Sequence, residues 1–187
     1  MRLILSIFIF SILTGCQTLD SALTDMGVIK LQSSQFDDVE RVVMSPAMTN
    51  HGMRTNADFG LRWNSDSGDY AILSVNLSTA TSFDPAEPLR LKIDKEDISL
   101  QPASNKSYGN LDIKYDEVVL YYTVSSNDYV IHKDQVKQLV DGTEGFYRIH
   151  LPYNKVYEGD INYDYRGYQS YVVGAFDKFY QRVWGEQ

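Results

Sequence analysis

The chain is poor in cysteine, in positive charge and in long apolar runs, and each shortage excludes a class of protein. A single cysteine, Cys16, among 187 residues excludes a scaffold built on internal disulfides. Lysine and arginine number 17 against 25 acidic residues, and the resulting net charge of −8 argues against binding to DNA or RNA. No apolar run reaches the roughly 20 residues that a membrane-spanning helix needs.

What remains is the composition of a globular protein, with 43% hydrophobic and 22% charged residues. The positive residues occur singly and form no basic patch, so nucleic acid is not an expected partner. The same acidity argues against electrostatic attraction to anionic lipid head groups, and any membrane attachment must therefore come from another feature of the chain.

The first fifteen residues have the pattern of an export signal. Arg2 supplies a short positive start, residues 3–13 form an apolar run interrupted by two serines, and small residues precede Cys16. An apolar run of this length is typical of a signal peptide rather than of a spanning helix. We therefore expect residues 1–15 to be a removable signal peptide.

The four residues Leu13-Thr14-Gly15-Cys16 resemble the lipobox of bacterial lipoproteins. The resemblance implies that the mature chain begins at Cys16 and carries three acyl chains, which anchor it stably because each buried CH₂ contributes about 0.8 kcal/mol. Gln17 follows the cysteine where Asp would favour retention in the inner membrane, which implies the outer membrane, on its periplasmic face. The resemblance covers the targeting segment alone, and an ordinary secretory signal with a chance cysteine is the alternative.

Residues 16–35 carry scattered serines and threonines, and we expect a lipidated tether that leads into one domain over residues 36–187. From Phe36 on, apolar and polar residues alternate in short runs separated by turn residues, which predicts an antiparallel sheet buried on one face. Residues 118–124 are apolar on both faces and predict a central, covered strand. Hairpins are expected over residues 59–77, 89–100 and 147–163.

Two segments have helical spacing instead. Residues 133–140, closed by Gly142, predict a short helix. Between Tyr168 and Val183 the apolar residues recur at i, i+3, i+4 and i+7, which predicts an amphipathic helix. Gly174 within it indicates either a close approach to the sheet or a helix that begins after it. The expected class is α+β: an antiparallel β-sheet or sandwich with one short helix and a C-terminal amphipathic helix.

No pattern of catalytic or metal-ligating residues emerges. The three histidines lack partners at zinc-ligand spacing, so we expect neither a metal nor a cofactor. Nucleophile motifs are absent as well, and we expect no catalytic residue, although an envelope hydrolase with a dispersed site stays an alternative. Residues 160–164 open like a calcium loop, but Tyr165 stands where that loop needs glycine, and an alternating strand explains the same residues.

Tyrosine is abundant: 14 occur in the chain, five of them within residues 157–171. Tyrosines bury a large area at low entropic cost on protein-binding and sugar-binding surfaces, although they also favour strands. The candidate binding residues are Tyr157, Tyr163, Tyr165 and Tyr168. The sequence therefore predicts an outer-membrane-anchored periplasmic lipoprotein with a non-catalytic binding or assembly role, whose partner is an envelope protein or, alternatively, a glycan.

Overall fold

The computed structural model describes residues 26–33, 38–49, 57–78, 83–84, 86–104, 108–109, 124–163 and 167–185. Its larger sheet holds β1 (Ile29–Ser33), β2 (Glu40–Met48), β3 (Ala57–Asn64), β4 (Tyr70–Ser78), β7 (Tyr108–Gly109) and β8 (Val124–His132). Its smaller sheet holds β5 (Leu89–Ile93), β6 (Glu96–Leu100), β9 (Gly145–Leu151) and β10 (Lys155–Asp160). The α-helices are α3 (Lys133–Asp141) and α4 (Tyr171–Trp184), and a short 3₁₀ helix covers Ser65–Ser67.

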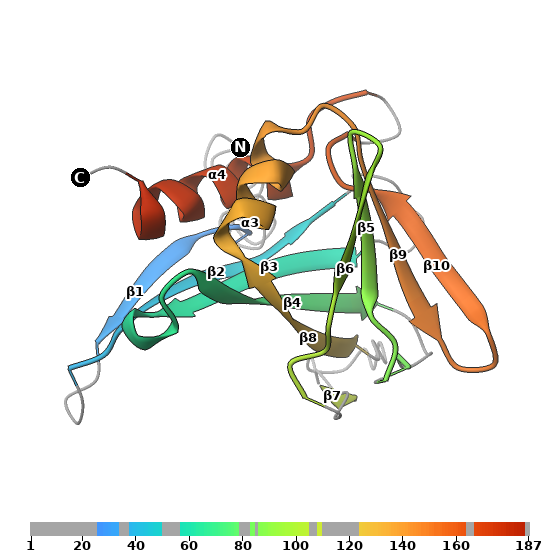
Figure 1. The fold of residues 1–187 in the computed structure, drawn as a ribbon, viewed down its shortest axis with the longest axis horizontal. Coiled ribbons are helices and arrows are strands. Elements are labelled where there is room, and N and C mark those ends of the chain that lie inside the picture. Colours follow the sequence, from blue (N-terminus) through green and yellow to red (C-terminus); the bar gives the residue numbers. More distant parts are fainter. Residues whose placement is uncertain are drawn as a thin grey trace, which may run out of the picture.

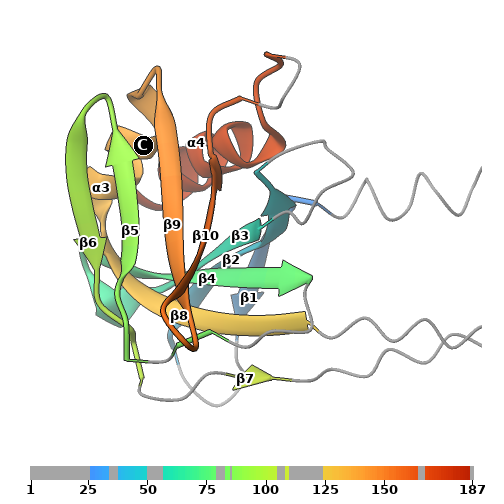
Figure 2. The ribbon, with the colours of Figure 1, turned by 90° about the vertical axis from the view of Figure 1, so that its right-hand side faces the viewer.

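All strand pairs are antiparallel, which confirms the predicted α+β class. The strand orders are β1-β2-β3-β4-β8-β7 in the six-stranded sheet and β10-β9-β5-β6 in the four-stranded sheet. The four-stranded sheet stands steeply across one end of the six-stranded sheet, and α4 covers the inner face of the latter (Figures 1 and 2). Within the described residues, neither helix has the length and apolar character required to cross a bilayer.

The three expected hairpins are confirmed as β3–β4, β5–β6 and β9–β10. Asp94 and Lys95 form the two-residue connection of the second hairpin with φ values of 46° and 80°, the conformation of a type I′ turn. The Asp94 carboxylate also accepts hydrogen bonds from the backbone N–H groups of Thr143 and Glu144. These bonds lower the pKa of Asp94 and fasten the turn to the connection between α3 and β9.

The third hairpin is shorter than expected. β10 ends at Asp160, and the predicted strand does not continue through Asn162 and Tyr163. Beyond β10 the backbone N–H of Ile161 donates to the carbonyl of Gly145, and the chain turns away toward α4.

The sheet begins earlier in the chain than expected. Residues 29–33, which lie within the segment expected to be a tether, pair with β2 as the edge strand β1. Every residue of β1 after Ile29 is exposed, including Leu31 at 53%. An edge strand with so little burial leaves no clear periodic pattern in the sequence.

Three further strands of the larger sheet, β2, β7 and β8, were not predicted. β2 contains Pro46 at a bulge between Met44 and Ala47, and both the proline and the bulge disrupt the alternation. β8 has Ser125 and Asn127 buried on its inner face, so its first half lacks apolar alternation. Of the predicted central strand over residues 118–124, only Val124 is described, where it begins β8.

Both predicted helices are confirmed. His132 precedes α3, where its Nδ1 accepts from the backbone N–H of Asp134 at 3.3 Å while Gln135 Oε1 accepts from the backbone N–H of His132 at 2.9 Å. α4 begins at Tyr171 and runs through Gly174, so neither expectation for that glycine holds. A Cβ at Gly174 would meet nothing within 4 Å, whereas one at Gly27 would lie 2.6 Å from Ala175 Cβ.

One buried hydrophobic cluster joins both sheets and both helices. Phe59 of β3 lies at its centre, with its ring centroid 5.4 Å from that of Tyr147 in β9 and 6.5 Å from that of Phe176 in α4. The strands of the larger sheet and the segment between β10 and α4 therefore pack on the same hydrophobic core.

Candidate functional site

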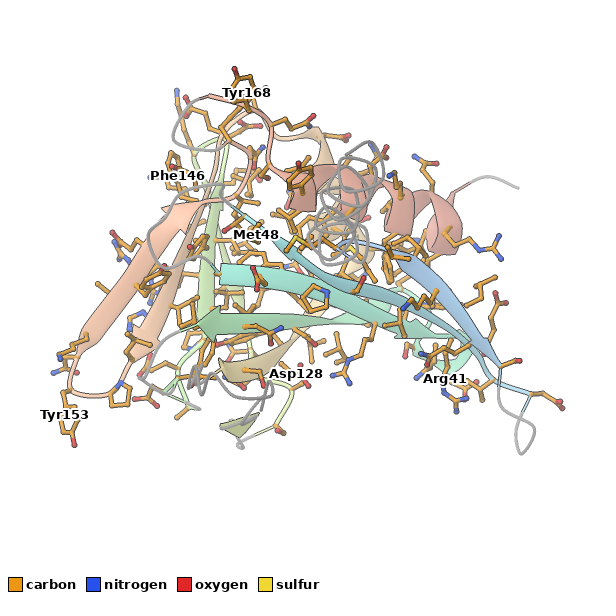
Figure 3. All side chains as sticks on the ribbon, turned by 180° about the vertical axis from the view of Figure 1, so that it is seen from behind. Arg41, Met48, Asp128, Phe146, Tyr153 and Tyr168 are labelled. Atoms are coloured by element: carbon orange, nitrogen blue, oxygen red, sulfur yellow. The ribbon has the colours of Figure 1, made fainter. Side chains whose placement is uncertain are left out.

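The outer face of the six-stranded sheet, on the side away from α4, carries a shallow groove of about 620 Å³. Asp128 and Arg41 mark this side of the sheet in Figure 3. Five neighbouring strands supply the polar groups of the lining, which include Lys30, Gln32, Ser45, Arg62, Ser74, Asn76, Ser126 and Asp128.

The shape of the groove follows from the strand register, from a glycine in β3 and from the bulge in β2. Gly60, Ser74 and Asp128 share one row across β3, β4 and β8. Gly60 contributes no side chain, and a Cβ there would lie 3.1 Å from the carbonyl oxygen of Met44. Pro46, at the bulge of β2, lines the groove beside it. The bulge and the glycine together make the depression in the sheet.

A hydrogen-bonded network fixes the polar side chains of the groove. Arg62 Nη2 donates to Asp128 Oδ2 at 2.6 Å, and Ser74 Oγ donates to Asp128 Oδ1 at 2.7 Å. Both carboxylate oxygens of Asp128 are therefore engaged. The Ser74 hydroxyl donates to this aspartate, and no histidine is among the described residues that line the groove.

Lys30 gives the groove a cation that the network does not use. It is exposed on the edge strand β1, and none of the ion pairs in the described part of the chain involves it. Among the described residues that line the groove, two cations, Lys30 and Arg62, stand against one carboxylate, that of Asp128. The groove thus has an excess of positive charge in a protein whose net charge is −8.

Asp58 lies one row away from the groove network on the same face of the sheet. Its strand partners are Met48 and Asn76, and burial raises the pKa of Asp58 to about 6. This carboxyl group therefore titrates near neutral pH.

The candidate tyrosines differ in how far the structure exposes them. Tyr157 is opposite Ile149 on the inner side of β10, half-buried, with its ring 6.1 Å from that of Tyr147. Tyr163 and Tyr168 are exposed at 46% and 66%. Tyr165 lies outside the described residues, as does Cys16. The alternation of β10 directs Tyr157 toward the core, whereas Tyr163 and Tyr168 are exposed.

The segment that carries Tyr163 and Tyr168 is fastened through its backbone. The buried Asn162 amide donates to the carbonyl oxygen of Gly142, and the Ser170 hydroxyl donates to that of Ile161. The Ser170 backbone N–H donates to the Asn162 carbonyl oxygen at 2.9 Å. Asn162 belongs to the segment that opens like a calcium loop, and in the structure its side chain fastens this segment to the end of α3.

The described ranges contain no group of three or more His, Cys, Asp or Glu side chains placed to hold a metal ion. His132 serves as the cap of α3, and His150 is half-buried on the outer side of β9. His51 lies among the residues that the structure does not describe.

No protein-family model matches the chain, and no curated protein is significantly similar to it. A crystal structure of invasion associated protein B from Bartonella henselae aligns with a TM-score of 0.37 and 15% sequence identity, over 71% of this chain and 77% of that chain. A similarity at that level carries no argument about fold or function.

Proposed function

We propose that the protein is a bacterial outer-membrane lipoprotein, anchored on the periplasmic side through acyl chains on Cys16, that binds an envelope partner without catalysis. The lipobox residues support the anchor, and the groove on the six-stranded sheet supports the binding role. The observation that carries the binding role is the Lys30 cation, which forms no ion pair within the described part of the chain and lies beside the fixed network of Arg62, Asp128 and Ser74.

The groove favours an extended polypeptide segment as the partner. Its described lining offers hydroxyl, amide and charged groups at fixed positions on strands and contains no aromatic ring on which a sugar could stack. Groups held in place before binding lose little entropy when a partner engages them. The surplus positive charge fits a segment that carries a carboxylate near Lys30.

In-cell crosslinking followed by mass spectrometry tests this proposal. The wild-type lipoprotein should capture a defined envelope protein, and Lys30→Glu should abolish that capture because the substitution places a like charge against the partner's carboxylate. Lys155→Glu is the matched control, since it makes the same charge change at an exposed position at the start of β10. Equal capture by the wild type and Lys30→Glu would contradict the assignment of the groove.

Titration of the purified protein with peptidoglycan fragments separates a polypeptide partner from a glycan. We expect no change in the fluorescence of the protein on titration. A saturable response that Lys30→Glu leaves intact would favour glycan binding at the exposed tyrosines over polypeptide binding in the groove.

A further inference from the structure

The described chain enters the domain beside the first turn of α4. Met26 and Gly27 line a hollow of about 270 Å³ together with Tyr171, Gly174 and Lys178. A Cβ at Gly27, where φ is 65°, would lie 2.6 Å from Ala175 Cβ, so the entering chain passes in direct contact with the helix. The point at which the tether meets the domain is therefore fixed at this end of α4.

Exposed tyrosines gather at the same end. Tyr163 and Tyr168 belong to the segment that leads into α4, and Tyr171 is the first residue of the helix. Their exposed fractions are 46%, 66% and 53%. We call these three residues the tyrosine end. Figure 3 shows Tyr168 at the upper edge of the molecule and Tyr153, in the β9–β10 turn, at its lower left edge.

The length of the tether limits how the domain can lie on a membrane. Ten residue steps separate Cys16 from Met26, and a chain of that length spans at most about 33 to 36 Å. A compact domain of this size is about 40 Å across. Acyl chains on Cys16 therefore keep the end where Met26 enters close to the bilayer, and the far end reaches it only if the tether runs back along the whole domain.

We propose that the tyrosine end faces the bilayer and that Tyr163, Tyr168 and Tyr171 enter its head-group region. This inference rests on the proposed lipid anchor at Cys16. A tyrosine ring with a polar tip suits the boundary between acyl chains and water, where such side chains are enriched. Lys178, beside Tyr171, is placed to meet a lipid phosphate. In this orientation the groove, on the side of the sheet away from α4, opens toward the periplasm (Figure 3).

The lone cysteine makes the orientation measurable on the full lipidated protein. With the Cys16 thiol acylated, a cysteine introduced by Tyr168→Cys is the single free thiol and accepts an environment-sensitive fluorophore. Tyr153→Cys, at a 94% exposed position in the β9–β10 turn and away from the tyrosine end, is the matched control. Both proteins are reconstituted in phosphatidylethanolamine–phosphatidylglycerol vesicles with and without lipids that carry a nitroxide quencher near the head group.

The probe at position 168 should lose most of its emission when the nitroxide lipids are present, and the probe at position 153 should keep its emission. Equal emission from both probes, or quenching at position 153 alone, would overturn the proposed orientation while leaving the lipid anchor intact. Wild-type protein treated with the same reagent should stay unlabelled. Labelling of its Cys16 would show a free thiol and would overturn both the anchor and the orientation that depends on it.

Discussion

The groove and the tyrosine end are held by the same core but are built in opposite ways. In the groove the side chains fix one another, because Arg62 and Ser74 both bind the carboxylate of Asp128 on neighbouring strands. At the tyrosine end the backbone is fastened through Asn162 and Ser170 while the tyrosine rings face solvent. Fixed polar groups suit a partner of defined chemistry, whereas exposed rings on a fastened backbone suit a surface without fixed geometry, such as a bilayer.

Phe59→Ala should destabilise both the groove and the tyrosine end, because both pack on the core around this residue. Phe59 packs against Tyr147 and Phe176, and removal of its ring leaves a cavity where the two sheets meet α4. The expected loss in the free energy of unfolding is about 3 to 5 kcal/mol, measured by denaturant titration. Phe146→Ala, at a position that is 46% exposed, is the control and should change stability by less than about 1 kcal/mol. If Phe59→Ala lowered the free energy of unfolding by less than about 1 kcal/mol, the two regions would not share a core around Phe59.

Asp58→Asn, beside the groove, should change the free energy of unfolding in a pH-dependent manner. Burial raises the folded-state pKa of Asp58 from 3.8 to about 6, so the folded state favours the protonated carboxyl. Its stability contribution is present below pH 3.8 and is lost as the pH rises through about 6.

Asp58→Asn should therefore unfold like the wild type at pH 4 and be more stable by about 2 to 3 kcal/mol at pH 7, as measured by urea titration at both pH values. Asp66→Asn, on the exposed turn after β3, is the control and should have little effect at either pH. An advantage for Asp58→Asn that is equal at pH 4 and pH 7 would refute the assigned titration.

Asn162→Ala should loosen the tyrosine end while the groove stays intact. The substitution removes the amide that donates to the Gly142 carbonyl oxygen and should cost about 1 to 3 kcal/mol. Hydrogen exchange should rise around Asn162 and Ser170 but not in β3, β4 or β8. The control is Gln169→Ala, which alters an exposed side chain in the same segment. Faster exchange across the six-stranded sheet would show that the two regions do not separate in this way.

Gly174→Ala should have the smallest effect and should stabilise the protein. Gly174 is exposed within α4, and an added methyl group meets nothing within 4 Å. Alanine in place of a helical glycine raises the free energy of unfolding by about 0.5 to 1 kcal/mol, which thermal unfolding detects. Gly27→Ala should destabilise instead, because φ is 65° there and Ala175 is in contact. A loss of stability in Gly174→Ala would mean that this face of α4 is covered.

The parts of the fold that the sequence predicts are those specified by neighbouring residues. Turn residues and alternating positions lie within each hairpin, and Gly142, which closes α3, directly follows the helix. β1 and β2 escaped prediction because exposure and a proline bulge removed their alternation. The core-facing position of Tyr157 is not visible in the sequence, because the pairing of β10 with β9 determines which side of the strand faces the core.

The groove could not be predicted as a site because it brings together residues as distant in sequence as Lys30 and Asp128. The alternating polar positions Arg62, Ser74 and Asn76 are visible in the predicted hairpin and were a partial signal for its outer face. Their convergence on Asp128 depends on the pairing of β4 with β8, and the polar inner face of β8 conceals that strand in the sequence.

The mass of the N-terminal peptide of the mature protein, isolated from the outer-membrane fraction, is the direct test of lipid attachment at Cys16. The binding role and the orientation both require a domain tethered through Cys16. We expect a chain that begins at Cys16 and carries the mass of three acyl chains. A mature chain with an unmodified Cys16, or one that retains residues 1–15, would contradict it.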